Sequence, residues 1–252
     1  LSACPSVKYI GVLATGYNVV DTAAAKERGI PVCNIPTYGT AAVGQFAIAM
    51  LLEICHHVAH HSDAVHEGRW SNNVDWCFWD YPLIELEGKT MGIIGFGRIG
   101  QRTGEIAKAL GMHVVAFDAY QSDAGKAIAS YVDLDTLLRE SDVISLHLLL
   151  TDETHGFISR DHIARMKKGV LLVNTARGAI IDEPAMIDAL KTGHIGHAAL
   201  DVFVEEPLPP NNPFTTLDNV TLSAHSAFRT PEASETLLRR ALDIAVRVAA
   251  ER

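Results

Sequence analysis

The chain has 252 residues, 48% of them hydrophobic and 20% charged, a balance that excludes a disordered or fibrous protein and indicates a globular one. A formal net charge of -9, with no long basic run and no apolar run of about 20 residues, argues against nucleic-acid and membrane partners. The four cysteines are far apart and form no C-x-x-C pair, so we expect a reducing, cytoplasmic setting.

The first 36 residues contain one βαβ pattern. The apolar segments "VKYIGVLATG" and "IPVCNIP" flank the helical segment "NVVDTAAAKERG". A unit of this size cannot close a hydrophobic core alone, and the chain starts with Leu shortly before a strand-like run. We therefore expect residues 1–36 to be the remnant of a second, smaller domain that is truncated at its N-terminus.

A long apolar helix follows. The run "TAAVGQFAIAMLLEICHHVAHHSDAV" is helical in pattern and has almost no polar face before its histidines. Because a helix that is apolar all round must be covered on every side, we expect the 40–62 helix to lie at an interdomain or homodimer interface. Its histidines have the i, i+4 spacing of a metal site, but no H-E-x-x-H motif and no third ligand accompany them. We therefore predict a polar helix end without metal, made by His56, His57, His60 and His61.

Aromatic side chains crowd the next segment, residues 70–82. They are Trp70, Trp76, Phe78 and Trp79. Clustered aromatic residues of this kind are typical of an interface or a core, so we place the segment in the same homodimer interface. The alternative is that one of these side chains reaches into the cleft of a neighbouring subunit.

From about residue 90 onward, apolar runs alternate with helical patterns. The runs "TMGIIGFG", "MHVVAFD", "DVISLHL", "GVLLVN", "HAALDVF" and "NVTLSAH" are apolar on both faces, which is typical of parallel strands covered by helices. The segments between them include the helical patterns "RIGQRTGEIAKALG" and "DEPAMIDALKTG". This alternation predicts a doubly wound, Rossmann-like α/β domain over residues 37–228. The amphipathic C-terminal helix of residues 229–252 is expected to pack back onto residues 1–36.

The segment "GFGRIG" predicts a dinucleotide site. It places Gly95, Gly97 and Gly100 in G-x-G-x-x-G spacing between a strand and a helix, where a tight turn and a helix N-terminus can hold a pyrophosphate. Asp118 ends the next strand. A carboxylate there accepts hydrogen bonds from ribose hydroxyls and repels a 2′-phosphate, so the expected cofactor is NAD. The alternative is an ordinary turn beside a solvated carboxylate.

Three further strand ends carry charged side chains. Arg177 follows "GVLLVNTA", Asp201 and Glu206 follow "HAAL", and His225 follows "NVTLSA". Ligands of an open α/β sheet bind beyond the carboxyl ends of its strands, so we expect these groups to share one cleft. An arginine grips a carboxylate, and a histidine paired with an acid can exchange a proton with a carbonyl oxygen. The alternative for each residue alone is a surface ion pair, or a capping or core histidine.

These segments resemble a known family. "GIIGFGRIGQ", "MKKGVLLVNTARGAIIDEPAMIDALKTGHIGHAALDVFVEEPL" and "DNVTLSAH" are similar to the D-isomer-specific 2-hydroxyacid dehydrogenases. "KYIGVLATGYNVVD" and "PTYGTAAVGQFAIAMLLE" look closest to the glycerate dehydrogenase or hydroxypyruvate reductase branch. The resemblance implies hydride transfer between NAD and a small 2-oxo or D-2-hydroxy acid, with hydroxypyruvate/D-glycerate first and glyoxylate second. It also implies that residues 1–36 and the C-terminal helix belong to a flavodoxin-like substrate domain.

The resemblance also implies roles for single residues. Arg177 anchors the substrate, and Glu206 pairs with His225, the acid–base residue. The residues implied at the cofactor are Gly95, Gly97, Arg98, Ile99 and Gly100 at the pyrophosphate, Asp118 at the ribose, Thr175 and Ala176 beside the nicotinamide, and Asp201 at its carboxamide. The backbone amides implied at the substrate carboxylate are those around Ala14, Thr15 and Gly16.

Two departures from the family pattern are visible. Leu149 stands in "HLLLT" where the family usually has proline, and "SAF" with Arg229 follows the histidine where the family usually has "IGG" or "IAW". The second departure changes the expected shape of the pocket. A formate dehydrogenase is disfavoured, because such relatives carry glutamine at the position of Glu206.

A rival hypothesis assigns the same fold to a protein that binds NAD(H) without catalysing a reaction. Corepressors that sense NAD(H) resemble this family and retain the arginine, the acid and the histidine. Against this alternative, the chain has no extended basic tail for recruiting partners.

Overall fold

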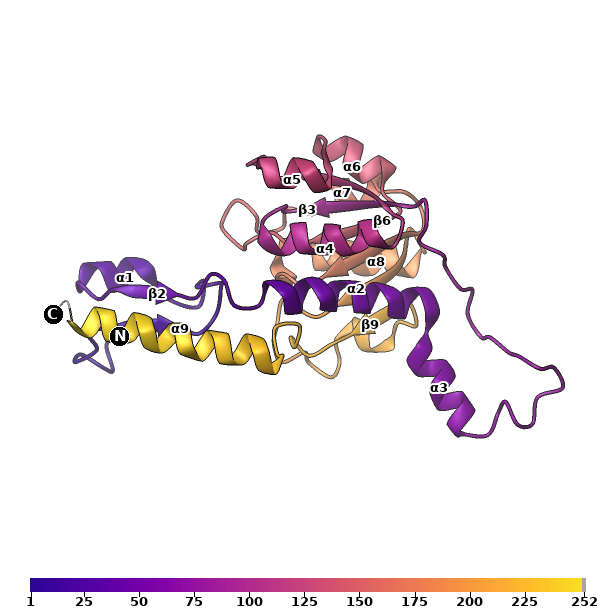
Figure 1. Cartoon of the computed structure of the whole chain (residues 1–252), viewed down its shortest axis with the longest axis horizontal. Helices are drawn as coiled ribbons and strands as arrows, with labels where there is room; N and C mark the ends of the chain where they lie inside the picture. The colour runs from indigo at the N-terminus through magenta and orange to yellow at the C-terminus, as the bar shows by residue number, and fades with distance from the viewer. Residues whose placement is uncertain (251–252) are drawn as a thin grey trace.

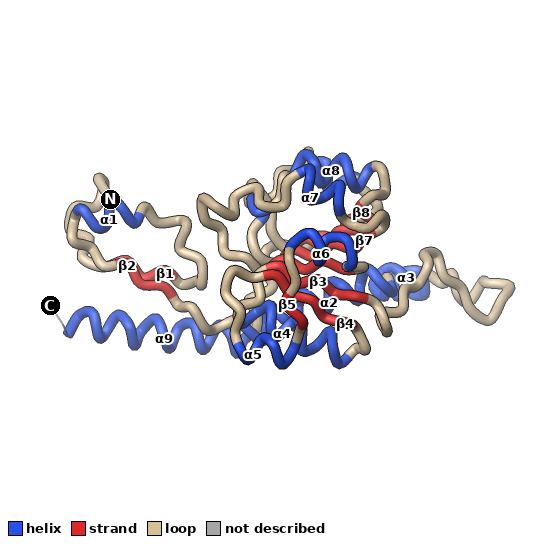
Figure 2. The backbone as a smooth tube through the Cα atoms, turned by 90° about the horizontal axis from the view of Figure 1, so that it is seen from above, coloured by secondary structure: helices blue, strands red, loops and turns tan. Residues whose placement is uncertain are grey.

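The computed structural model describes residues 1–250 and has three parts (Figure 1). A central α/β domain lies in the middle. On one side, the N-terminal unit lies near the long C-terminal helix α9 (Pro231–Ala250), and on the other side the helix α3 (Val58–His66) and the segment after it project away. The N-terminus and the last turn of α9 lie on the same side of the central domain in both views (Figures 1 and 2).

A seven-stranded parallel sheet forms the centre of the molecule, in the order β5-β4-β3-β6-β7-β8-β9. The strands are β3 (Thr90–Ile94), β4 (His113–Phe117), β5 (Ser130–Tyr131), β6 (Val143–Leu146), β7 (Val170–Asn174), β8 (Ile195–Leu200) and β9 (Val220–Leu222). The chain order reverses between β3 and β6, so the carboxyl ends of these strands border the ligand crevice of a doubly wound sheet. The predicted Rossmann-like fold is confirmed. The edge strand β5 was not predicted, because two residues are too few for an apolar pattern.

Helices cover both faces of this sheet. On one face α2 (Thr40–His56) packs against β7, β8 and α4 (Arg98–Ala109), and α5 (Asp123–Ile128) packs against α4. The other face carries α6 (Leu134–Glu140), α7 (Arg160–Arg165) and α8 (Glu183–Lys191). Each layer buries its own apolar cluster, around Leu51 and Ile93 on one side and around Leu137 and Leu172 on the other. Burial on both faces explains why the strand sequences do not alternate.

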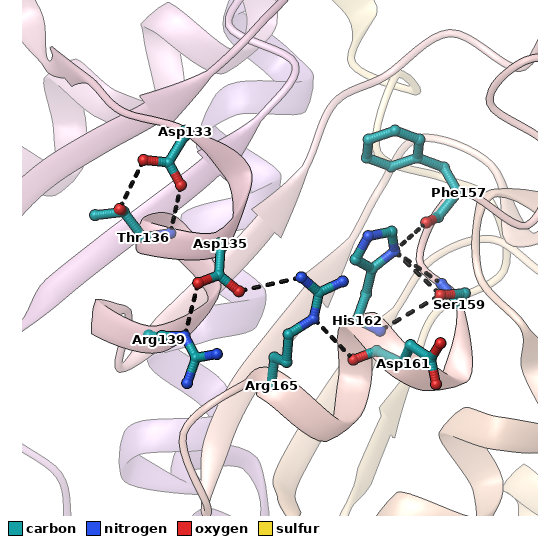
Figure 3. A network of polar contacts seen from close by, with 9 residues as sticks. All are labelled: Asp133, Asp135, Thr136, Arg139, Phe157, Ser159, Asp161, His162 and Arg165. Atoms are coloured by element: carbon teal, nitrogen blue, oxygen red, sulfur yellow. Dashed lines mark hydrogen bonds and ion pairs between the residues drawn. The ribbon is translucent and has the colours of Figure 1, made fainter.

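Polar side chains join α6 to α7 (Figure 3). Asp135 of α6 accepts hydrogen bonds from Arg139 of the same helix at 2.7 Å and from Arg165 of α7 at 3.1 Å. Ser159 starts α7 in a reciprocal capping box with His162. These contacts fix α7 against α6, and the Phe157 ring, which stacks on His162, also stacks on Phe117 at the end of β4.

The prediction of a single 40–62 helix was wrong. The chain forms two helices, α2 and α3, which are bent by 58° at a break. His57 causes the break, because its φ of 48° lies in the left-handed region and cannot continue a helix. Much of α2 is covered within the chain, whereas α3 buries only Ala64. No single helix in residues 1–250 is long and apolar enough to cross a membrane, and only the bent pair α2 and α3 passes by length and composition.

The N-terminal unit contains β1 (Ile10–Val12), α1 (Thr22–Glu27) and β2 (Val32–Asn34), with β1 and β2 parallel, as the sequence predicts. The helix α9 leaves the central domain on the same side as this unit (Figures 1 and 2). Its buried residues, Ala233 and Leu237, lie in its first two turns. Apolar side chains further along stay exposed, namely Leu238, Leu242 and Val246.

Two imidazoles are held neutral inside the central domain. His147 follows β6, and its Nε2 lies 2.9 Å from the Ser145 hydroxyl. His197 in β8 has its Nε2 3.0 Å from the Thr221 hydroxyl. Burial lowers the pKa of His147 to about 4. Burial, with a smaller effect of His57, lowers the pKa of His197 to about 4 as well.

We expect the free energy of unfolding to decrease as the pH falls from about 6.5 toward 4. The unfolded chain takes up a proton at His147 near pH 6.5, whereas the folded chain does so only near pH 4, so the contribution is complete above pH 6.5 and is lost below it. Between pH 7 and pH 5 this amounts to about 2 kcal/mol for one imidazole. Urea unfolding of the wild type and of His147→Gln at pH 7 and pH 5 measures this change in the free energy of unfolding. Equal pH dependence in the two proteins would rule His147 out as the titrating group.

Candidate active site

The glycine loop joins β3 to α4, and its glycines have different surroundings. Gly95 has a φ of 91°, and a Cβ there would lie 2.7 Å from the backbone that follows β6. A Cβ on Gly100 would clash with the carbonyl oxygen of Gly95, so this glycine allows the helix to approach the turn. Gly97 is the N-cap of α4 and has open space beside it. Arg98 and Ile99 form the first turn, where the helix N-terminus favours an anion.

Asp118 follows β4, and its carboxylate lies against the glycine loop. One carboxylate oxygen accepts a hydrogen bond from the Phe96 amide at 2.6 Å, and the other accepts one from the Tyr120 amide at 2.9 Å. The parallel register of β3 and β4 brings the two strand ends together. Each carboxylate oxygen has a further lone pair that can accept a hydrogen bond from a ribose hydroxyl.

His225 and Glu206 are in direct contact. The His225 Nδ1 lies 2.6 Å from Glu206 Oε2, and the other carboxylate oxygen accepts a hydrogen bond from the Phe203 amide at 2.9 Å. The two side chains are 35% and 33% exposed, so the pair is both anchored and accessible. Within residues 1–250, no side chain or backbone group is bonded to His225 Nε2. That nitrogen is therefore available to exchange a proton with a ligand.

Asp201 holds the turn that carries His225. This aspartate is fully buried, and its two carboxylate oxygens accept hydrogen bonds from the Ser226 and Ala227 amides at 2.9 and 3.0 Å. Its carbonyl oxygen accepts a third bond from the His225 amide at 2.8 Å. These bonds keep His225 in the left-handed region, with a φ of 51°. The predicted contact between Asp201 and a carboxamide stays a prediction.

Arg177 follows β7 and forms no ion pair with the described residues. Its Nη1 donates a hydrogen bond to the Ala176 carbonyl oxygen at 2.6 Å. The buried Asn174 side chain shapes this loop, because it donates to the Arg177 carbonyl oxygen at 2.9 Å and accepts from the Ala176 amide at 3.0 Å. A Cβ on Gly16 would clash with Arg177 Nη2. The N-terminal unit and the central domain therefore meet at this guanidinium.

The turn after β1 is tied down through its carbonyl groups. The Ala14 carbonyl oxygen accepts a hydrogen bond from the Ile35 amide at 3.0 Å. The Thr15 carbonyl oxygen accepts one from the Asn34 side chain at 2.6 Å. In the described part of the chain, the amides of Thr15 and Gly16 have no acceptor. This turn can therefore offer two N–H donors beside Arg177.

Tyr38 and Phe228 connect the two halves of the site, and the sequence did not point to either as a site residue. Their rings meet edge to face at 6.3 Å, and the Phe228 ring lies 6.1 Å from the His225 ring. Burial raises the pKa of Tyr38, and the nearby Arg177 guanidinium opposes this. No hydrogen bond or ion pair among residues 1–250 joins Arg177 directly to His225. The two aromatic rings therefore bridge these groups.

Several features fit a bound dinucleotide. Thr175 follows β7, and its hydroxyl is buried without a hydrogen-bond partner among the described residues. A buried hydroxyl of this kind is costly unless a ligand pairs with it. The open space beside Gly97 and the Asp118 carboxylate fit the phosphates and ribose of the same ligand. No group of three or more His, Cys, Asp or Glu side chains in residues 1–250 is placed to hold a metal ion.

Strands of one parallel sheet carry, after their carboxyl ends, a glycine loop beside Asp118, the guanidinium of Arg177 and the carboxylate-bound imidazole of His225. This combination indicates an oxidoreductase of the dinucleotide-dependent class. The family model described as "D-isomer specific 2-hydroxyacid dehydrogenase, NAD binding domain" matches residues 48–227. The chain belongs to the D-isomer-specific 2-hydroxyacid dehydrogenases, and its cofactor is NAD. The resemblance found in the sequence is thereby confirmed.

Individual relatives support the same assignment. The hydroxypyruvate reductase of Blautia hydrogenotrophica is 56% identical over 244 residues, which cover 96% of this chain and 74% of that protein. The glyoxylate reductase of Aeropyrum pernix is 41% identical over 249 residues, covering 96% and 72%. Among solved structures, the D-lactate dehydrogenase of Aquifex aeolicus, complexed with NAD and lactic acid, has a TM-score of 0.88 and 31% identity, covering 100% of this chain and 79% of that one.

Proposed function

We propose that this NAD-dependent dehydrogenase interconverts hydroxypyruvate and D-glycerate, and that glyoxylate is its second substrate. The contact between His225 and Glu206, next to the nucleotide crevice, is the observation that carries the proposal. The 56% identity to a hydroxypyruvate reductase supports the choice of acid.

In this proposal, one set of residues binds the substrate and another transfers the proton. The Arg177 guanidinium and the amides of Thr15 and Gly16 bind the substrate carboxylate. NADH, when bound, supplies the hydride to C2, and NAD⁺ accepts it in the reverse direction. His225 gives a proton to the C2 oxygen and recovers it in reverse, while Glu206 orients the ring and stabilises its protonated form.

A substrate panel tests the proposal against the rival, an NAD(H)-sensing corepressor-like protein. The purified chain is mixed with NADH and with hydroxypyruvate, glyoxylate or pyruvate, and the NADH absorbance is followed. We expect kcat/KM to be highest for hydroxypyruvate and lower for glyoxylate. Binding of NADH without any consumption of it would favour the sensing protein, and a preference for pyruvate would overturn the choice of acid.

Asp118→Ala should weaken the use of NADH and relax the bias against NADPH. The carboxylate repels a 2′-phosphate and offers acceptors to the ribose, and alanine removes both effects. We expect the ratio of kcat/KM for NADH over NADPH to fall at least about tenfold. Asp118→Asn is the matched control, because it keeps the side-chain size and removes only the charge. An unchanged ratio in both variants would show that Asp118 does not face the ribose.

We also infer a homodimer that uses α2, α3 and the 70–82 segment. The projecting segment carries large exposed apolar side chains, including Val74 at 99% and Trp76 at 86% exposure. Exposed apolar groups gathered in one segment mark an interaction surface. The alternative, an aromatic side chain that enters a neighbour's cleft, uses the same surface. Sedimentation of the wild type and of Trp76→Ser measures whether this surface joins two copies.

The domain assignment and the cellular location are proposals as well. Residues 37–228 form the dinucleotide-binding domain, and residues 1–36 with 229–252 are parts of a substrate domain. A cytoplasmic location is supported by the free thiols of the four cysteines, Cys4, Cys33, Cys55 and Cys77.

A further inference from the structure

The imidazole of His61 bonds to both ends of the arm, which is defined as residues 58–82. The Nδ1 of His61 lies 2.8 Å from the His57 carbonyl oxygen. A carbonyl oxygen only accepts hydrogen bonds, so Nδ1 carries a hydrogen. The Nε2 of His61 lies 3.1 Å from the Asp80 amide, which only donates, so Nε2 contributes its lone pair. Both bonds form only with the neutral ring that is protonated at Nδ1, since an imidazolium has two donors and no acceptor.

The two bonds join the points at which the arm leaves the domain and returns to it. His57 is the break between α2 and α3, where the chain bends by 58°. Asp80 lies at the other end of the arm, on its way back to the domain, and the neighbouring Tyr81 ring lies 4.3 Å from the His57 ring. His61 therefore links the outgoing helix of the arm to its returning segment.

The groups around this link disfavour additional positive charge. Burial lowers the pKa of His57, the Glu53 carboxylate opposes this, and the charges of His61, His60 and His56 lower it further. From β8, the His197 ring faces His57 at 5.8 Å. The Glu53 carboxylate of α2 is thus opposed by several imidazoles around His57.

A second carboxylate, that of Asp80, is already engaged. It accepts hydrogen bonds from the Arg69 guanidinium through both oxygens and has His60 Nε2 at 2.7 Å. Protonation of His60 strengthens its contact with this carboxylate, whereas protonation of His61 breaks the bond to the Asp80 amide. His60 is exposed, and exposed ion pairs contribute little. The hydrogen bond lost at the half-buried His61 therefore outweighs the contact strengthened at His60.

We propose that His61 is a proton-sensitive link, whose protonation releases the Asp80 amide and loosens the arm from the central domain. It is a regulatory device of the arm and leaves the predicted active-site residues untouched.

Hydrogen exchange of the full-length chain at pH 8 and pH 5 tests the link. We expect the protection factor of the Asp80 amide, corrected for intrinsic exchange, to fall about tenfold at pH 5, and to become independent of pH in His61→Gln. His60→Gln is the matched control, since it alters the neighbouring contact with Asp80 and should keep the decrease. Unchanged protection in the wild type, or a decrease that persists in His61→Gln, would overturn the proposal.

Two further measurements keep the test decisive. Sedimentation at both pH values separates loosening of the arm from dissociation of subunits. If His61→Gln does not fold, nitrogen NMR of the wild type decides the matter. At pH 8 the His61 proton should be on Nδ1, and a proton on Nε2 would refute the link.

Discussion

Replacing His225 by asparagine should lower kcat for hydroxypyruvate reduction by about 10² to 10⁴ and change NADH affinity by less than about twofold. The substitution removes proton transfer to the substrate oxygen but no group that is expected to bind the cofactor. Asparagine suits the position, because His225 has a φ of 51° and asparagine tolerates the left-handed region. Steady-state rates with hydroxypyruvate, together with a fluorescence titration of NADH, measure the two quantities separately.

Glu206→Gln is the control for this variant. Glutamine keeps an oxygen for the Phe203 amide but loses the charge that favours the protonated imidazole. We expect a smaller loss of kcat than in the His225 variant. If the His225 variant lost NADH affinity and turnover to the same extent, the histidine would have to be assigned a structural role.

Replacing Arg177 by alanine should reduce kcat/KM for hydroxypyruvate by about 10² or more, since truncation of one partner of a hydrogen-bonded charge pair costs about 2–5 kcal/mol. Most of the change should appear in KM, because the guanidinium holds the carboxylate before and during the reaction. NADH binding should remain close to that of the wild type. Initial rates over a range of hydroxypyruvate concentrations, with saturating NADH, measure the effect.

Two variants separate charge from position at this arginine. Arg177→Lys keeps the positive charge and loses the planar fork, so it should recover only part of the affinity. Gly16→Ala keeps the guanidinium but introduces a Cβ that clashes with its Nη2 and displaces it. We therefore expect a rise in KM with little change in NADH affinity. A wild-type KM in all three variants would show that the substrate carboxylate does not bind at Arg177.

The sequence was most informative where one local rule determined the structure. The strand, the glycine spacing and the helix around Gly95, Gly97 and Gly100 were predicted, because Gly95 and Gly100 answer steric requirements of that turn and Gly97 leaves open space for a ligand. The contact between Glu206 and His225 was also expected, because the resemblance to the family implies it and parallel strands end on one edge of the sheet. These features depend on short segments and on a topology that the alternation of strands and helices already implies.

Other features depend on contacts that sequence reasoning does not reach. The break at His57 follows from a left-handed residue inside a run with good helical pattern, and nothing in "ICHHVAHH" distinguishes that histidine from its neighbours. Tyr38 lies at the start of the predicted dinucleotide-binding domain and approaches Phe228, at its far end in the sequence, only after the chain has folded. Asn174 stood at the end of a predicted strand, yet its hydrogen bonds to the following loop required the coordinates.

The close approach of Gly16 to Arg177 couples binding of the acid to the relative position of two parts of the chain. The glycine belongs to the N-terminal unit and the guanidinium to the large sheet, so an acid gripped by both spans two bodies. Any opening between those bodies separates the amides from the guanidinium and weakens the grip. The dissociation constant of the acid therefore depends on how readily the two bodies close as well as on how well the acid fits between them.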